Sequence, residues 1–207
     1  MPDHTRPVFF VIGRRTDAQQ VENVENMSQT VTTRDQDEYR ALRATIRERG
    51  TARVCLFVGG FAAWGAMTLA TTALASTPLA TLLPLLLLAA LFEAIYALHV
   101  GVERIGRYIQ VFHEHEIDRG WEHIAMAFGR PKGAATMDAL FLMPFALATA
   151  FNAAPAWLLH PTIEETVFVG GAHALFALRL FIARQAGQRQ RAIDLERFAQ
   201  LKRGSDL

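Results

Sequence analysis

The chain is poor in the residues that most enzymes and metal sites need. It has one cysteine, Cys55, so an intramolecular disulfide and any site built from several thiolates are excluded. It has no glycine-rich phosphate-binding loop and no GxSxG nucleophile motif. We therefore expect a protein that is not an enzyme and that carries no cofactor. The formal net charge of +1 gives no reason to expect a nucleic-acid partner.

Charged residues are missing from two long runs. Residues 54–102 contain no lysine or arginine and one acid, Glu93, and residues 139–163 contain no Asp, Glu, Lys or Arg. A helix needs about 20 apolar residues to cross a bilayer, so the first run is long enough for two spans and the second for one. Residues 166–183 form a fourth, weaker candidate because Arg179 interrupts them.

This pattern predicts an all-α, polytopic membrane protein with four transmembrane helices arranged as two hairpins, with cytoplasmic amphipathic helical extensions. The alternative is a soluble protein with long core helices, but such a protein does not normally run 49 residues with a single charge. The expected segments are a polar leader (1–33) that is flexible over residues 16–33, a basic amphipathic juxtamembrane helix (34–53), a first transmembrane hairpin (54–101), a cytoplasmic helical linker (102–135), a second transmembrane hairpin (136–183) and a charged cytoplasmic helical tail (184–207).

The basic residues gather in three segments. Residues 1–53 carry nine, residues 102–136 carry five and residues 179–207 carry seven, which together are all 21 in the chain. Because Lys and Arg concentrate on the cytoplasmic side of inserted helices, both termini are expected in the cytoplasm. Arginine outnumbers lysine 19 to 2, a skew typical of GC-rich bacterial coding, so the expected location is the bacterial inner (cytoplasmic) membrane.

Residues 34–53 have the spacing of an amphipathic helix. Arg40, Arg43 and Arg47 lie on one side, away from the apolar positions. We interpret this basic face as a contact with anionic lipid headgroups, and the alternative is a basic vestibule leading to a pore. The charged tail either continues the last span into the cytoplasm or pairs with a neighbouring chain.

Residues 92–116 begin inside an apolar run and become strongly polar. At helical spacing, Glu103 and Arg107 fall on the side opposite the apolar stripe, which predicts a helix that leaves the hydrocarbon with one packed face and one solvated face. The apolar phase shifts around residues 118–120, so we expect a break there. A short second helix would follow and return to the membrane.

The HEHE run at residues 113–116 resembles a chelator but has poor geometry for one. His113 and His115 are two residues apart, about 200° around a helix, and do not converge on one ion. Glu116 and His123 are separated by the expected break. No metal site is predicted, because a site needs three or four converging ligands.

Polar residues inside apolar spans are costly and usually face the bundle interior. The candidates here are Glu93, His99, Asn152, His173 and Arg179. A weak repeat aligns residues 94–104 with 174–184 at an offset of 80 and places Glu93 level with His173. The two are then expected to pair, as a structural hydrogen bond or as a proton or cation site. Arg179 lies about one turn before the inner end of its span and is expected to snorkel to the headgroups.

A transmembrane haem would need two histidines at matched depth. The same offset separates His99 and His173 by six residues, about 9 Å along the membrane normal, which argues against a bis-histidine haem. The leading interpretation is a non-enzymatic membrane protein that acts as a scaffold, accessory subunit or regulator of a membrane assembly. The alternative is an oligomeric channel or a proton- or cation-coupled transporter that uses Glu93 and His173. The expected partners are the lipid bilayer and either further copies of the chain or a membrane complex.

Overall fold

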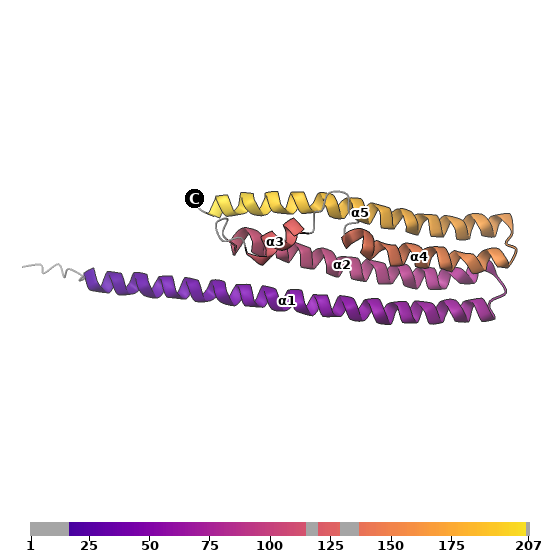
Figure 1. Cartoon of the computed structure of the whole chain (residues 1–207), viewed down its shortest axis with the longest axis horizontal. Helices are drawn as coiled ribbons and strands as arrows, with labels where there is room; N and C mark the ends of the chain where they lie inside the picture. Colours follow the sequence, from indigo (N-terminus) through magenta and orange to yellow (C-terminus); the bar gives the residue numbers. More distant parts are fainter. Residues whose placement is uncertain (1–16, 115–119, 129–136, 206–207) are drawn as a thin grey trace, which may run out of the picture. The chain divides into compact units, whose positions relative to one another are not determined.

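All the secondary structure in the described part of the chain is helical. The computed structural model describes residues 17–114, 120–128 and 137–205, and the chain divides into two compact units, Met1–Arg40 and Ala41–Leu207. The elements are α1 (Asp17–Leu74), the 3-10 helix η1 (Pro78–Thr81), α2 (Leu82–Phe112), α3 (Trp121–Phe128), α4 (Met137–Leu158) and α5 (Ile163–Ser205) (Figure 1). The predicted all-α class is therefore confirmed.

Three helical segments are long and apolar enough to cross a membrane. They are Thr33–Leu74, Pro78–Phe112 and Ile163–Gly204. The last of these contains residues 166–183, the segment that Arg179 interrupts. The remaining candidate, residues 139–163, largely coincides with α4, in which Leu142–Leu158 forms a shorter apolar helix.

Helix α1 begins well before the amphipathic segment. Sequence analysis assigned residues 16–33 to a flexible leader, but the helix already starts at Asp17, so this expectation is wrong for residues 17–33. The physical reason is that no glycine or proline occurs between residues 17 and 49, and nothing in this polar stretch stops a helix. The rest of the leader, residues 1–16, lies outside the described part of the chain.

The core of the second unit is built by α2, α4 and α5. Leu88, Phe92 and Ile95 of α2 are completely buried, as is Phe145 of α4. The rings of Phe92 and Phe145 meet edge to face with 5.3 Å between centroids, a favoured aromatic arrangement. Phe176 of α5 packs edge to face on Phe92 with centroids 6.0 Å apart. Aromatic contacts therefore join all three helices at one level.

Helix α1 packs on this core through few side chains. Phe61 reaches Phe145 of α4, with ring centroids 5.1 Å apart. Gly60 faces Leu91 of α2 so closely that a Cβ atom at this position would overlap the leucine side chain. None of the residues of α1 from Ala41 to Leu74 is buried. Most of the apolar surface of α1 is therefore exposed, as on a helix that faces lipid or another chain.

A capping box starts α5. Thr162 Oγ1 accepts a hydrogen bond from the Glu165 N–H at 3.2 Å, and a carboxylate oxygen of Glu165 accepts one from the Thr162 N–H at 3.0 Å. This reciprocal pair satisfies donors that a helix start otherwise leaves unpaired. The turn before it contains His160, whose φ of 51° is unusual for a residue with a side chain.

The C-terminal tail continues α5 as one helix, as the first of its two interpretations predicts, while its cytoplasmic location stays a prediction. Phe198 packs edge to face on Tyr108 of α2, with ring centroids 5.6 Å apart. Lys202 Nζ donates to the Val111 carbonyl at 2.6 Å, near the end of α2, where a helix has carbonyl groups without helical partners. The tail is thus held against the last turns of α2.

Candidate functional site

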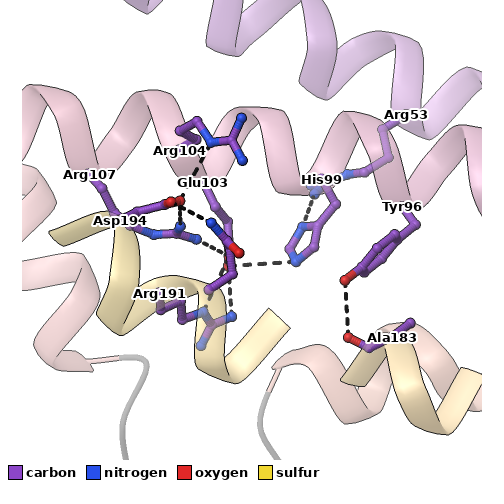
Figure 2. Close-up of polar contacts among 10 residues, drawn as sticks. Arg53, Tyr96, His99, Glu103, Arg104, Arg107, Ala183, Arg191 and Asp194 are labelled. Carbon is purple, nitrogen blue, oxygen red and sulfur yellow. Dashed lines mark hydrogen bonds and ion pairs between the residues drawn. The ribbon is translucent and has the colours of Figure 1, made fainter. Parts of the chain in front are cut away.

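A buried cluster of ion pairs joins the C-terminal half of α2 to the C-terminal half of α5 (Figure 2). The side chain of Arg107 is 1% exposed and that of Asp194 is 6% exposed, and their closest nitrogen and oxygen atoms are 2.5 Å apart. Arg107 Nη2 also donates to a carboxylate oxygen of Glu103 at 2.6 Å. Burying a guanidinium is costly unless it is paired, and here two carboxylates pair it.

Further side chains complete this cluster. Arg191 of α5 donates to both carboxylate oxygens of Glu103, at 2.7 and 3.2 Å. Asp194 accepts a hydrogen bond from Gln190 at 2.6 Å and lies 3.6 Å from Arg104. The guanidinium group of arginine donates in a planar fork. The contacts of Arg107 with Asp194 and of Arg191 with Glu103 therefore also fix how α2 and α5 are oriented toward each other.

The prediction that this side of α2 is solvated is wrong for Arg107. The sequence shows Glu103 and Arg107 as a pair four residues apart on a polar stripe, which is typical of an exposed helix face. Their other partners, Asp194 and Arg191, lie 87 and 88 residues away along the chain. The charged tail was the available signal, because its acids and arginines could meet a polar stripe only if the tail folded back on it.

His99 lies beside the ion-pair cluster and connects it to α1. Its Nδ1 is 3.0 Å from Arg53 Nη1, and its Nε2 is 3.6 Å from the Glu103 carboxylate (Figure 2). Since a guanidinium can only donate, Nδ1 acts as the acceptor. A cavity of about 20 Å³, lined in part by Tyr96, His99 and Arg191, has room for one water molecule.

Tyr96 makes a further link between α2 and α5. Its hydroxyl group donates to the backbone carbonyl of Ala183 at 3.1 Å (Figure 2). A buried tyrosine hydroxyl usually finds such a partner, because an unpaired one is costly away from water. The contact lies one turn before His99 and extends the polar interface toward the apolar core.

Glu93 pairs with Arg179 and not with His173, so the pairing expected from the internal repeat is wrong. Both nitrogen–oxygen contacts of the pair measure 2.8 Å, from Nε and from Nη2 of the guanidinium. The guanidinium also lies over the rings of Phe92 and Tyr96, 5.6 and 5.5 Å from their centroids. The Arg179 side chain is thus engaged by Glu93, and its snorkelling to the headgroups stays a prediction. Its Cβ points toward the start of α5, which directs the side chain to Glu93.

His173 instead binds Asn152. The Asn152 amide nitrogen donates to the Thr81 carbonyl at 2.8 Å and lies 3.1 Å from His173 Nε2. His173 Nδ1 is 2.8 Å from the carbonyl of Val169, which can only accept. Nδ1 therefore carries the proton and Nε2 accepts from Asn152. The three groups join η1, α4 and α5 at the opposite end of the bundle from the ion-pair cluster.

A pocket of about 200 Å³ opens next to this histidine. Its wall is mostly apolar and includes Pro78, Trp157 and Val169, and its polar groups include His173 and Glu165. Glu165 is engaged in the capping box of α5, and both ring nitrogens of His173 have partners. The pocket therefore offers a ligand mainly apolar contacts and few free hydrogen-bonding groups.

Carboxylate contacts hold the first turn of helix α3. Glu114 accepts hydrogen bonds from the N–H groups of Glu122 and His123 and from the His123 ring. Glu122 in turn accepts from Arg43 of α1 at 2.6 Å. Burial by itself raises the pKa of the Glu114 carboxyl, but these hydrogen bonds and the charge of His123 outweigh it and hold the pKa below its ordinary value.

The expected short helix after a break is confirmed by α3, while its return to the membrane stays a prediction. Of the predicted basic face, Arg43 makes the contact just described, Arg40 pairs with Asp37 at 3.3 Å, and Arg47 is exposed. Two members of the HEHE run, His115 and Glu116, lie outside the described residues. Within the described ranges, no three His, Cys, Asp or Glu side chains gather in a way that could hold a metal ion.

In the described part of the chain, polar side chains of α2, α4 and α5 bind one another in three places: the ion pairs around Arg107, the Glu93–Arg179 pair, and Asn152 with His173. Each cluster joins side chains from different helices, as interhelical cross-links do. Comparison with known protein families, curated proteins and solved structures found no match for this chain.

Proposed function

We propose that this chain is a four-span integral membrane protein that acts as a scaffold, accessory subunit or regulator within a membrane assembly. The spans would be formed by α1, α2, α4 and α5 as two hairpins, with both termini in the cytoplasm. The inner membrane of a bacterium is the proposed location. The charge distribution along the sequence supports this topology, since the 21 basic residues all lie on its cytoplasmic side except Arg179, which lies in the inner half of the last span.

The observation that carries the assembly role is how the intramembrane polar side chains are used. His173 and Asn152 bind each other and backbone carbonyls, and Glu93 binds Arg179. A conduit needs polar groups that line a continuous path and exchange partners with the moving ion. These groups instead fix helices to one another, which favours a structural role. A wide exposed apolar surface on α1 and α5 supports contact with lipid or other subunits.

The first test addresses membrane insertion. Alkaline carbonate extraction of native membranes should leave the chain in the pellet, and cysteines introduced near both termini should react only from the cytoplasmic side. Cys55 is replaced by alanine in these variants so that the introduced cysteine is the only one. Recovery of the chain in the carbonate supernatant, or labelling of a terminus from outside, would overturn the proposal.

The second test separates assembly from transport. We expect Glu93→Gln to lower the yield or change the particle mass in lipid nanodiscs, with no specific change in ion flux in proteoliposomes. The exposed Glu164 provides the matched control, Glu164→Gln. Normal yield and mass together with loss of a flux shown by the native protein would instead establish the alternative, a channel or a proton- or cation-coupled transporter.

One observation favours that alternative function. The side chains of Glu93 and Arg179 are 50% and 37% exposed although they lie on apolar helices. Charged groups at such positions can face a water-filled path formed between subunits. The flux measurement above therefore decides between the two functions.

A further inference from the structure

We propose that the face of α2 and α5 around the Glu93–Arg179 pair is a contact surface for a second copy of this chain. This inference rests on the proposed membrane insertion and names the partner of the assembly. The face is defined by Glu93 and Arg179 with the exposed residues beside them, Leu86, Ala90 and Ala97 of α2 and Leu175 and Ile182 of α5.

The ion pair on this face has a defined geometry. Two parallel contacts of 2.8 Å join the guanidinium and the carboxylate, and two aromatic rings pack against the guanidinium. A bidentate pair of this kind has one defined geometry. The pair is therefore held in place before any partner arrives, which lowers the entropy lost on binding.

The pair lies within the depth of the hydrocarbon. Counted from the start of each helix, Glu93 is about 17 Å and Arg179 about 24 Å along the helix axis, whereas the hydrocarbon is about 30 Å thick. A guanidinium has five N–H donors and Glu93 takes two of them. Lipid chains cannot accept the others, so contact with lipid alone would leave polar groups unsatisfied at this depth.

A second copy supplies the matching groups by symmetry. Copies with the same topology in one membrane are related by an axis along the membrane normal, so equivalent residues lie at equal depth. A face that carries both a carboxylate and a guanidinium is then complementary to itself, because Glu93 of one copy lies level with Arg179 of the next. An unrelated partner helix would need its own carboxylate and its own guanidinium at the depth of Glu93 and Arg179.

The neighbouring side chains permit close approach. Ala90 and Ala97 lie one helical turn before and after Glu93, and both are exposed. Small residues on one face of a transmembrane helix allow a neighbouring helix to approach closely. The face therefore combines a small-residue stripe on α2 with a polar pair that a partner can cover.

Disulfide cross-linking in native membranes tests the contact without weakening it. Ala97→Cys is introduced after replacement of Cys55 by alanine, and the matched control is Val58→Cys on the exposed face of α1, where the native side chain is 64% exposed. We expect oxidation to trap Ala97→Cys at twice the mass of the chain and to leave Val58→Cys largely monomeric. Cross-linking of the two variants to the same extent, or trapping of a protein of another mass, would overturn the inference.

Charge variants provide the second measurement. We expect Glu93→Gln and Arg179→Gln to lower the association constant of the oligomer, measured over a series of protein-to-lipid ratios, by about tenfold, a change of about 1.4 kcal/mol. The control is Arg184→Gln, because Arg184 is an exposed arginine on the same helix. Arg179→Lys keeps the charge and should retain more of the oligomer than Arg179→Gln.

The outcomes distinguish this inference from the proposed function. If the chain resists carbonate extraction but Ala97→Cys does not cross-link, the contact surface is wrong and membrane insertion stands. If the chain is extracted by carbonate, membrane insertion itself fails. Reaction of Ala97→Cys with a membrane-impermeant, water-soluble thiol reagent in the oligomer would show a water-filled path, and would overturn the covered interface.

Discussion

Arg107 of α2 and Asp194 of α5 form a salt bridge with an N–O distance of 2.5 Å and almost no solvent exposure. The pair fastens the far end of α5 to α2 beyond the apolar core. A bridge in this position helps to hold the two helices together beyond that core. Its removal therefore has a clear expected consequence.

Asp194→Asn should lower the free energy of unfolding by on the order of 3 kcal/mol. The substitution removes one of the two negative charges that neutralise the buried guanidinium of Arg107. The second carboxylate on Arg107, from Glu103, keeps the loss near the lower end of the range for broken buried pairs. Thermal unfolding in detergent measures the effect, with Glu196→Gln as the control, since Glu196 is exposed on the same helix. An equal loss in both variants would contradict the prediction.

The cross-link at the other end is a hydrogen-bonded group. Asn152→Ala should cost about 1–3 kcal/mol, because His173 Nε2 and the Thr81 carbonyl both lose a buried donor. The same unfolding assay applies, with Thr72→Ala as the control, because the Thr72 hydroxyl bonds only within its own helix turn and is exposed. A loss no greater than that of the control would show that η1 is held by other contacts.

Gly59 and Gly60 allow a controlled test of how α1 packs on α2. Gly60→Ala should destabilise the contact with α2, since the added methyl group overlaps Leu91, whereas a Cβ at Gly59 meets no atom within 4 Å. We expect Gly59→Ala to be neutral or slightly stabilising, because alanine favours the helix over glycine by about 1 kcal/mol. In a Leu91→Ala background, Gly60→Ala should cost less than it does in the native chain, because the overlapping side chain is absent. Equal effects of the two glycine variants would rule out this contact.

The attachment of α3 should depend on pH. The pKa of Glu114 is lower in the folded protein than its ordinary value of 4.5, so the carboxylate stabilises α3 fully above pH 4.5. The stabilisation is lost as the pH falls below 4.5 and through the folded-state pKa, because the protonated carboxyl accepts hydrogen bonds poorly. Hydrogen exchange at residues 121–128 measures the effect.

The control for α3 is Glu114→Gln, which cannot titrate. This variant should show fast exchange of the α3 amides at neutral pH and no further change on acidification. Arg43→Gln removes the contact with Glu122 and leaves Glu114 intact, so its exchange should keep the pH dependence. A pH dependence that survives in Glu114→Gln would assign it to another group.

Much of the helical architecture was predictable from the sequence because it follows local patterns. The apolar runs, the break before α3 and the continuation of the tail were all visible as spacing and composition. The start of α1 at Asp17 does not follow from composition, because polar segments are typical of flexible leaders even where, as here, no residue stops a helix. The Thr162–Glu165 spacing is a local capping-box motif that predicts the start of α5.

The partners of the polar residues were less predictable, because they depend on how helices far apart in sequence turn toward one another. An alignment at an offset of 80 placed Glu93 level with His173, whereas the structure pairs Glu93 with Arg179, 86 residues away. The difference of six residues is nearly two helical turns. A weak repeat in Ala- and Leu-rich segments cannot fix the register of two helices more closely than that.

The continuity of α5 has a mechanical consequence. One uninterrupted helix of 43 residues, about 64 Å long, carries the capping box, His173, Arg179 and Asp194. A rigid rod cannot turn or slide at one end alone. Movement of this rod that opens the pocket beside His173 is therefore transmitted to the salt bridge of Asp194 with Arg107, so that the two ends of the helix bundle share a single mechanical state.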